Sequence, residues 1–197
     1  MHSTAATSYC YRIHYKELNV IWKLSTLFLK HIPFDHENLV FCCIGTDRST
    51  GDALGPLVGT QLSEYQPFPF HIIGTLDQPL HALHLEEQMN LLSMKQPNAF
   101  IVAIDACLGN RQSIGQFLFQ NEALQPGKAT GKNLPAVGDI ALKGIVNTAG
   151  FMENAVLQST RLSVSFNMSR ILSHAIILAY RRYLFLTDRH STPLKSM

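Results

Sequence analysis

Short runs of consecutive apolar residues alternate along the chain with segments of helical periodicity. Such a run has no polar side to turn toward water, so it predicts a strand that is buried on both faces of a sheet. Strands that alternate with helices form βαβ units around a parallel sheet. We therefore predict an α/β protein, a three-layer α/β/α sandwich with a mostly parallel central sheet. The predicted strands are 39–44, 71–75, 99–104, 114–119 and 140–146, and the predicted helices are 18–32, 53–65, 80–94 and 167–186.

The length of 197 residues favours one domain over the whole chain, 1–197. Within it, residues 1–36 are predicted to form an N-terminal helical segment that packs on an α/β core of residues 37–187, and residues 188–197 to form a tail. Residues 120–138 are rich in glycine, proline and small polar side chains and show little periodicity. We interpret this stretch as a long functional or mobile loop.

Charge and cysteine usage restrict the partners and the compartment. Sixteen Lys and Arg against fourteen Asp and Glu leave a net charge of +2, which is too small for sequence-independent binding of nucleic acid. The N-terminus has no basic stretch followed by an apolar one, and no run of 18 uncharged apolar residues occurs. The four cysteines show neither C-x-x-C spacing nor the density of a disulfide scaffold. We expect a cytoplasmic protein with no nucleic-acid or membrane partner, and homo-oligomer formation is left open.

The segment FCCIGTDRSTGDALGPLVG runs from a predicted strand through a polar turn into a predicted helix. In open α/β sheets, ligands bind beyond the carboxyl ends of the strands, where loops meet the N-termini of helices. We expect Asp52 to lie there, with Asp47, Ser49 and Gly51 shaping a substrate-binding cleft. Because Asp52 directly precedes a predicted helix, a role as its N-cap is the alternative.

A second carboxylate follows another apolar strand. In IVAIDACLG the strand ends at Asp105, which should lie at the same edge of the sheet as Asp52. Two carboxylates in one cleft can share a proton, so that the ionised partner activates a water and the protonated partner donates to a carbonyl oxygen. The same pair can instead hold a divalent metal. We favour the acid and base pair and predict no cofactor.

Other polar residues give weaker indications. His81 and His84, with Glu86 and Glu87, have the spacing of metal ligands on a helix, but a solvated polar face explains them more simply. Cys107 is near Asp105 in the sequence, yet no catalytic histidine is identifiable, so a small buried apolar role is favoured.

The segments GTDRSTGDALGPLVG, IDACLG and GDIALKGIVNTAGFMENAVLQSTRLS closely resemble the YyaC-type sporulation proteins of endospore-forming bacteria, over most of residues 38–185. That family is in turn similar to the germination protease that degrades small acid-soluble spore proteins, whose α/β/α fold is shared with hydrogenase-maturation endopeptidases. The resemblance assigns the active-site carboxylates of the germination protease to Asp52 and Asp105. The chain is shorter than that protease and has no evident propeptide. In the maturation enzymes, acidic residues at the same two places help a histidine to bind metal, and that histidine is not identifiable in this sequence.

The resemblance implies an aspartate-dependent peptidase that acts on spore proteins, with small acid-soluble spore proteins as partners, in the cytosol of the forespore or the mother cell. Two alternatives stay open at this point. One is a non-catalytic binding or structural protein of the spore, and the other is a metal-dependent maturation endopeptidase.

Overall fold

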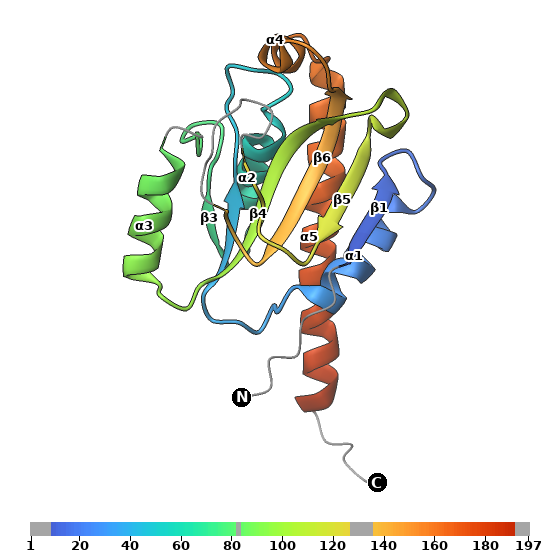
Figure 1. Cartoon of the computed structure of the whole chain (residues 1–197). Coiled ribbons are helices and arrows are strands. Elements are labelled where there is room, and N and C mark those ends of the chain that lie inside the picture. Colours follow the sequence, from blue (N-terminus) through green and yellow to red (C-terminus); the bar gives the residue numbers. More distant parts are fainter. Residues whose placement is uncertain (1–8, 82–83, 127–135, 192–197) are drawn as a thin grey trace, which may run out of the picture.

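A six-stranded sheet lies at the centre of the computed structural model, which describes residues 9–81, 84–126 and 136–191 (Figure 1). The strand order is β1-β5-β6-β4-β2-β3. β5 runs antiparallel to both of its neighbours, and the other three pairings of the sheet, β2 with β3, β2 with β4 and β4 with β6, are parallel. The strands are β1 Cys10–His14, β2 Leu39–Cys43, β3 His71–Ile73, β4 Phe100–Gly109, β5 Gln116–Gln120 and β6 Ile140–Thr148.

Helices cover both faces of the sheet, which confirms the predicted three-layer architecture with a mostly parallel sheet. On one face, α1 (Val20–His31), α2 (Leu54–Glu64) and α5 (Leu162–Ser191) enclose the larger apolar core. On the other face, α3 (Leu85–Lys95) packs over a smaller one. Alternate residues of each strand divide between the two cores, as the parallel strands require: Phe41 and Leu142 face the first, Val40 and Ala141 the second.

The N-terminal segment 1–36 contains the predicted helix packed on the core, but it also contains a strand, β1, that precedes this helix and was not predicted. β1 adds to β5 at the edge of the sheet, with Cys10 opposite Gln120 and His14 opposite Gln116. The β1 sequence CYRIH is short and mixes polar with apolar residues, so it lacks the apolar run that identified the central strands. The helix itself is close to the prediction, and Leu24 and Phe28 bury its apolar side in the core.

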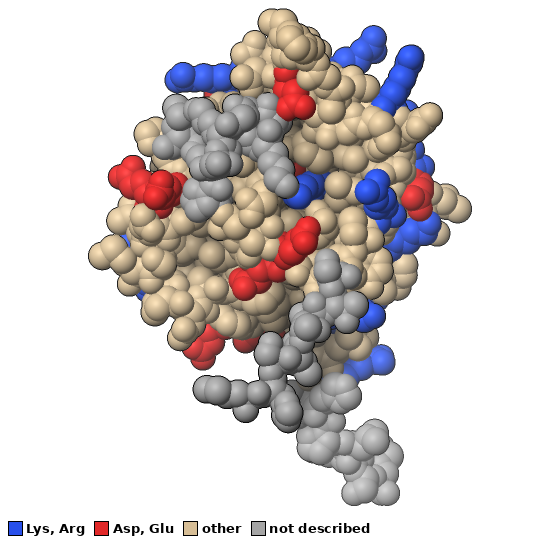
Figure 2. Space-filling view, viewed as in Figure 1, with Lys and Arg blue, Asp and Glu red and all other residues tan. Residues whose placement is uncertain are grey.

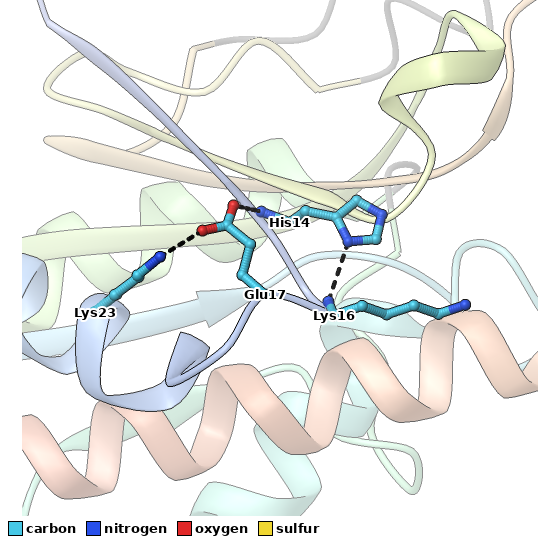
Figure 3. A network of polar contacts seen from close by, with 4 residues as sticks. All are labelled: His14, Lys16, Glu17 and Lys23. Atoms are coloured by element: carbon cyan, nitrogen blue, oxygen red, sulfur yellow. Dashed lines mark hydrogen bonds and ion pairs between the residues drawn. The ribbon is translucent and has the colours of Figure 1, made fainter.

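A small polar network fixes the turn between β1 and α1 (Figure 3). The Glu17 carboxylate accepts a 2.8 Å hydrogen bond from the backbone N–H of His14 and a 2.7 Å bond from the Lys23 ammonium. The Lys23 bond is the main reason that the pKa of Glu17 lies below its usual value, and the His14 bond adds to it. The Lys16 backbone N–H also donates to Nδ1 of His14, at 3.1 Å. The network ties β1 to the start of α1, although its members are too exposed to contribute much stability.

The observed bounds of two elements, β4 and α3, differ from the predicted ones in ways that affect the candidate site. β4 was predicted to end at residue 104 but continues to Gly109, so Asp105 lies within a strand and not after it. α3 begins at Leu85, five residues later than predicted, because Leu80 pairs with Ile44 in an isolated bridge and is buried in the smaller core. The bridge extends the sheet locally and brings residue 81 toward the end of β2.

The C-terminal part of the chain differs from the prediction in length. The long helix α5 starts at Leu162 and runs to Ser191, and a short helix, α4 (Glu153–Gln158), precedes it. Figure 1 shows α5 behind the sheet and projecting beyond its lower end. By length and composition, Leu162–Arg189 also meets the criteria for a membrane span. In this fold its apolar stripe is used for packing, since Leu172 and Ala179 are buried in the core.

The ends of the predicted loop 120–138 belong to the core. Leu124 and Val137 exchange two backbone hydrogen bonds of 2.8 and 2.9 Å and are buried beside Ala141 on the α3 side of the sheet. Residues 127–135, the centre of this loop, lie outside the described part of the chain, so its predicted role stays a prediction.

Glycines on one side of α2 let this helix contact the backbone at the ends of two strands. A Cβ on Gly55 would lie 2.1 Å from the carbonyl oxygen of Ile44, and a Cβ on Gly59 would lie 1.9 Å from that of Gly74. Real Cβ atoms do not approach an oxygen this closely, so a side chain at either position would push α2 off the sheet. The close contact determines where α2 begins, and with it the place of Asp52.

Candidate active site

The loop between β2 and α2 carries the first predicted carboxylate and is held by contacts with the α4 region. The Gly51 amide donates a 2.9 Å hydrogen bond to the Leu157 carbonyl, and the Thr50 hydroxyl bonds to the carbonyls of Gln158, at 3.1 Å, and Thr160. Figure 1 shows α4 and this loop at the same end of the sheet. The loop conformation, and with it the position of Asp52, therefore depends on the segment that follows β6.

Gly45 allows the loop to fold back on itself. Its φ of +146° is rare for residues with a side chain, and a Cβ there would lie 2.1 Å from the backbone oxygen of Asp52. The same oxygen accepts a 3.3 Å hydrogen bond from the Thr46 amide. Asp52 is thus returned to the end of β2 by a turn that requires glycine.

Asp52 is not the cap of α2. The helix begins at Leu54, its N-cap residue is Ala53, and no side chain makes a capping hydrogen bond. This outcome removes the alternative role that the sequence left open. Burial instead raises the pKa of the Asp52 carboxyl, while the neighbouring Ser49 hydroxyl and the charge of His81 oppose part of that rise.

Asp105 lies in β4 one position beyond the last residue of β2, since Cys43 pairs with Ile104. Its carboxylate oxygen Oδ1 accepts a 2.8 Å hydrogen bond from the Ala106 amide. The pKa of Asp105 is raised to about 8, first by burial and then by repulsion from Asp52, while the Ala106 amide and Lys143 act in the opposite direction. Near neutral pH this carboxyl group therefore holds a proton in the folded protein.

The structure thus brings the two predicted catalytic carboxylates together. Asp52 comes from a loop and Asp105 from a strand, and they are close enough for the charge of one to raise the pKa of the other. Carboxyl groups coupled in this way titrate as a pair, in which one keeps a proton while the other ionises. Asp105 is the group that keeps it, because its pKa is raised to about 8.

The three predicted substrate-binding residues have different surroundings. Asp47 is exposed, and its carboxylate receives a long hydrogen bond of 3.5 Å from the Thr46 hydroxyl. The Ser49 hydroxyl is buried beside the Asp52 carboxyl, and the two groups stop short of full hydrogen-bond geometry. Gly51 is buried, and a Cβ there would lie 2.8 Å from the Leu157 carbonyl oxygen, which gives it a packing role. Contact of these residues with a substrate stays a prediction.

Two residues at the site were missed or assigned differently from the sequence. Lys143 lies directly opposite Asp105 across the β4–β6 pairing, and no local pattern marks it. His81 was considered only as a metal ligand with His84, but its charge acts on the Asp52 carboxyl. The pairing between distant strands and the bridge at Leu80 bring these residues to the site, so only the fold reveals them.

The other chemical possibilities find little support among the described residues. Burial, followed by the charge of Asp105, raises the pKa of the Cys107 thiol to about 12, so it stays protonated and is a poor nucleophile at neutral pH. His84 and Glu87 are both exposed, with 3.9 Å between Nδ1 and Oε2. Within the described ranges, no group of three His, Cys, Asp or Glu side chains is arranged to hold a metal ion. The described side chains therefore do not assemble the site of three or more ligands that the metal-dependent alternative requires.

Replacing Lys143 with methionine is expected to raise the pKa of Asp105 above its value of about 8, because the ammonium across the ladder favours the ionised carboxylate. An NMR titration of the carboxyl carbons measures this pKa directly. Lys30→Met, which removes an exposed charge from α1 on the opposite face of the sheet, serves as the matched control. An Asp105 pKa that stays the same or falls in Lys143→Met would contradict this role.

The fold and the site define an α/β protein with two coupled carboxylates, one on the loop that follows β2 and one within the neighbouring parallel strand β4. The chain belongs to the DUF1256 family, described as a protein of unknown function, whose match covers residues 12–175. It is 47% identical over 143 residues to "Uncharacterized protein YyaC" of Bacillus subtilis (strain 168), which corresponds to 73% of this chain and 70% of that protein. The resemblance to YyaC-type proteins is therefore confirmed.

Two solved structures show weaker similarity. A [NiFe] hydrogenase maturation protease HycI from Thermococcus kodakarensis KOD1 aligns with a TM-score of 0.46 and 16% identity over 71% of this chain and 92% of its own. An uncharacterized protein from Wolinella succinogenes aligns with a TM-score of 0.37 and 14% identity over 78% and 99% of the two chains. Neither similarity is strong enough to carry an argument about activity.

Proposed function

We propose that this protein is a peptidase in which Asp52 and Asp105 form an acid and base pair around a hydrolytic water. The observation that carries the proposal is the pairing of a buried carboxyl group with a second one, since burial, and then repulsion from Asp52, raises the pKa of Asp105 to about 8. A carboxylic acid that stays neutral near pH 7 beside a second carboxylate is the arrangement that general acid–base hydrolysis needs.

In this mechanism the ionised Asp52 takes a proton from the water as its oxygen attacks the peptide carbonyl carbon. Asp105 donates its proton to the carbonyl oxygen, which gives a neutral tetrahedral intermediate. The C–N bond then breaks, the amine leaves with the proton that Asp52 accepted, and Asp105 recovers its own proton from the hydroxyl group as the carboxylic acid forms. The Ala106 amide fixes the orientation of Asp105, and Lys143 limits how far its pKa rises.

The proposed substrates are spore proteins, with small acid-soluble spore proteins as the first candidates, and the proposed location is the cytosol of the forespore or the mother cell. Two observations support this choice: the chain is 47% identical to YyaC of Bacillus subtilis (strain 168), and its segments around Asp52 and Asp105 resemble the germination protease.

Mass spectrometry of small acid-soluble spore proteins incubated with the protein tests the proposal. We expect defined fragments with the wild type and a loss of cleavage rate of about 100-fold or more in both Asp52→Asn and Asp105→Asn. Asp77→Asn, which removes an exposed carboxylate on another loop, is the matched control. Each variant is first shown to fold by circular dichroism.

The absence of fragments between about pH 4 and pH 8 would contradict the proposal, because a carboxylate pair sharing one proton reaches its working state within that window. Cleavage that survives both substitutions would contradict it equally. Intact substrate that binds the protein would instead indicate the non-catalytic binding role.

A further inference from the structure

A groove of about 450 Å³ lies between the edge strand β3 and helix α3, and neither of the two carboxylates is among its lining residues. One wall is β3 with the segment that follows it, from His71 to Leu80. The other wall is a single stripe of α3 and its flanks, formed by residues at helical spacing: His84, Gln88, Leu91, Leu92 and Lys95. The groove is therefore bounded by a strand edge on one side and a helix face on the other.

The strand edge of this groove offers backbone groups. β3 is the last strand in the sheet order, with β2 on one side. In a parallel pair, only one of two facing residues turns its N–H and C=O toward the other. The Ile44 amide donates to Ile104 in β4 at 2.7 Å, so the odd-numbered residues of β2 turn toward β3, and Phe41 faces Ile72. The backbone N–H and C=O of Ile72 consequently point away from β2, toward the outer edge of the sheet that borders the groove.

The helix wall offers apolar surface and the positive charge of Lys95. Leu91 is 42% exposed beside the buried Leu92, which makes a place for an apolar side chain. Lys95 is the charged residue among the described groove-lining residues, which include no Asp or Glu, so its ammonium is the group that favours an acidic side chain. The 11 residues of α3 extend over about 16 Å, enough for about five residues of an extended chain.

From this geometry we infer that the groove binds an extended peptide segment with alternating acidic and apolar side chains, which adds as a strand to β3 and rests against α3. Strand addition supplies hydrogen bonds to the Ile72 backbone, and the alternation of a strand directs every second side chain toward Leu91. The inference concerns binding and holds whether or not the bound peptide is cleaved at the carboxylates.

Fluorescence anisotropy with a labelled octapeptide of alternating glutamate and valine tests the inference. We expect saturable binding to the wild type. Ile72→Pro removes the outward N–H without touching the β2 ladder, as proline is tolerated on an edge strand, and should weaken binding about tenfold. The same peptide with N-methyl groups on alternate residues should bind as weakly, while Ile72→Val keeps the wild-type affinity.

Charge reversal on the helix wall provides an independent arm that does not rely on the proline variant folding. Lys95→Glu should weaken binding of the glutamate peptide about threefold or more and improve binding of a lysine–valine peptide. Lys30→Glu on α1 makes the same change in net charge away from the groove and should have no effect. Asp105→Asn should also bind the peptide normally, which separates this inference from the proposed peptidase.

Three results would overturn the inference. The first is a flat titration with both peptides, and the second is binding that persists in Lys95→Glu and with the N-methylated peptide. The third is self-association of the wild type in sedimentation velocity that Ile72→Pro abolishes and the peptide does not compete with, since the groove would then bind a second copy of this chain.

Discussion

The Asp105→Asn variant is expected to be more stable than the wild type at pH 8, by about 3 kcal/mol. Asp105 has a pKa of about 8 in the folded protein against an ordinary 3.8, so folding favours its protonated form. The free energy of unfolding of the wild type is therefore free of any penalty from Asp105 below about pH 4, and it falls as the pH rises from about 4 to about 8. The full shift would correspond to nearly twice this value, and we discount it because the residue is half-buried and partly screened by water.

Chemical denaturation of wild type and variant at several pH values between about 4 and 8 measures the difference. The asparagine keeps the acceptor for the 2.8 Å bond from the Ala106 amide, so packing and local hydrogen bonding should be retained. Asp77→Asn, at an exposed carboxylate, should follow the wild-type curve. If the difference between Asp105→Asn and the wild type does not change with pH, Asp105 has an ordinary pKa and the acid–base proposal loses its basis.

Gly59→Ala is expected to lower the free energy of unfolding by about 3 kcal/mol. The new methyl group would lie 1.9 Å from the carbonyl oxygen of Gly74, a backbone atom that can move only with the end of β3. This cost exceeds the gain in helix propensity of about 1 kcal/mol that alanine brings in an ordinary helix.

The matched control is Gly150→Ala, where an added Cβ meets no atom within 4 Å. Its free energy of unfolding should stay within about 0.5 kcal/mol of the wild-type value. Denaturant titration of the three proteins decides the matter, and a Gly59→Ala variant as stable as the wild type would show that α2 can move away from the sheet without penalty.

The central strands of the fold were predictable because a strand that is buried on both faces appears in the sequence as a run of apolar residues. The runs LVFCC and FIVAI identified β2 and the first half of β4, and their carboxyl ends led to Asp52 and Asp105. The continuation of β4 through DACLG was not predictable, since a carboxylate inside a central strand contradicts the pattern of a buried run. β1 was missed for a related reason, because an edge strand needs no apolar run.

The surroundings of the carboxylates were less predictable than the carboxylates themselves. Lys143 reaches Asp105 through the register of β4 on β6, and His81 reaches Asp52 through the bridge between Ile44 and Leu80. Both depend on pairings between residues far apart in the sequence, which local periodicity does not encode. The absence of an α2 cap by Asp52 was likewise decided by the turn at Gly45 and not by helix propensity.

The two carboxylates differ in how firmly the fold holds them. Asp105 lies in the middle of the sheet, where a shift would require β4 to slip against β6, whereas Asp52 lies on a loop that a few hydrogen bonds fasten to the α4 region. Their separation can therefore change through the loop alone. Because repulsion between the two groups falls as they move apart, any molecule that draws the loop outward also lowers the pKa of Asp105 and releases a proton. Occupancy of this end of the sheet and proton release are thus thermodynamically linked.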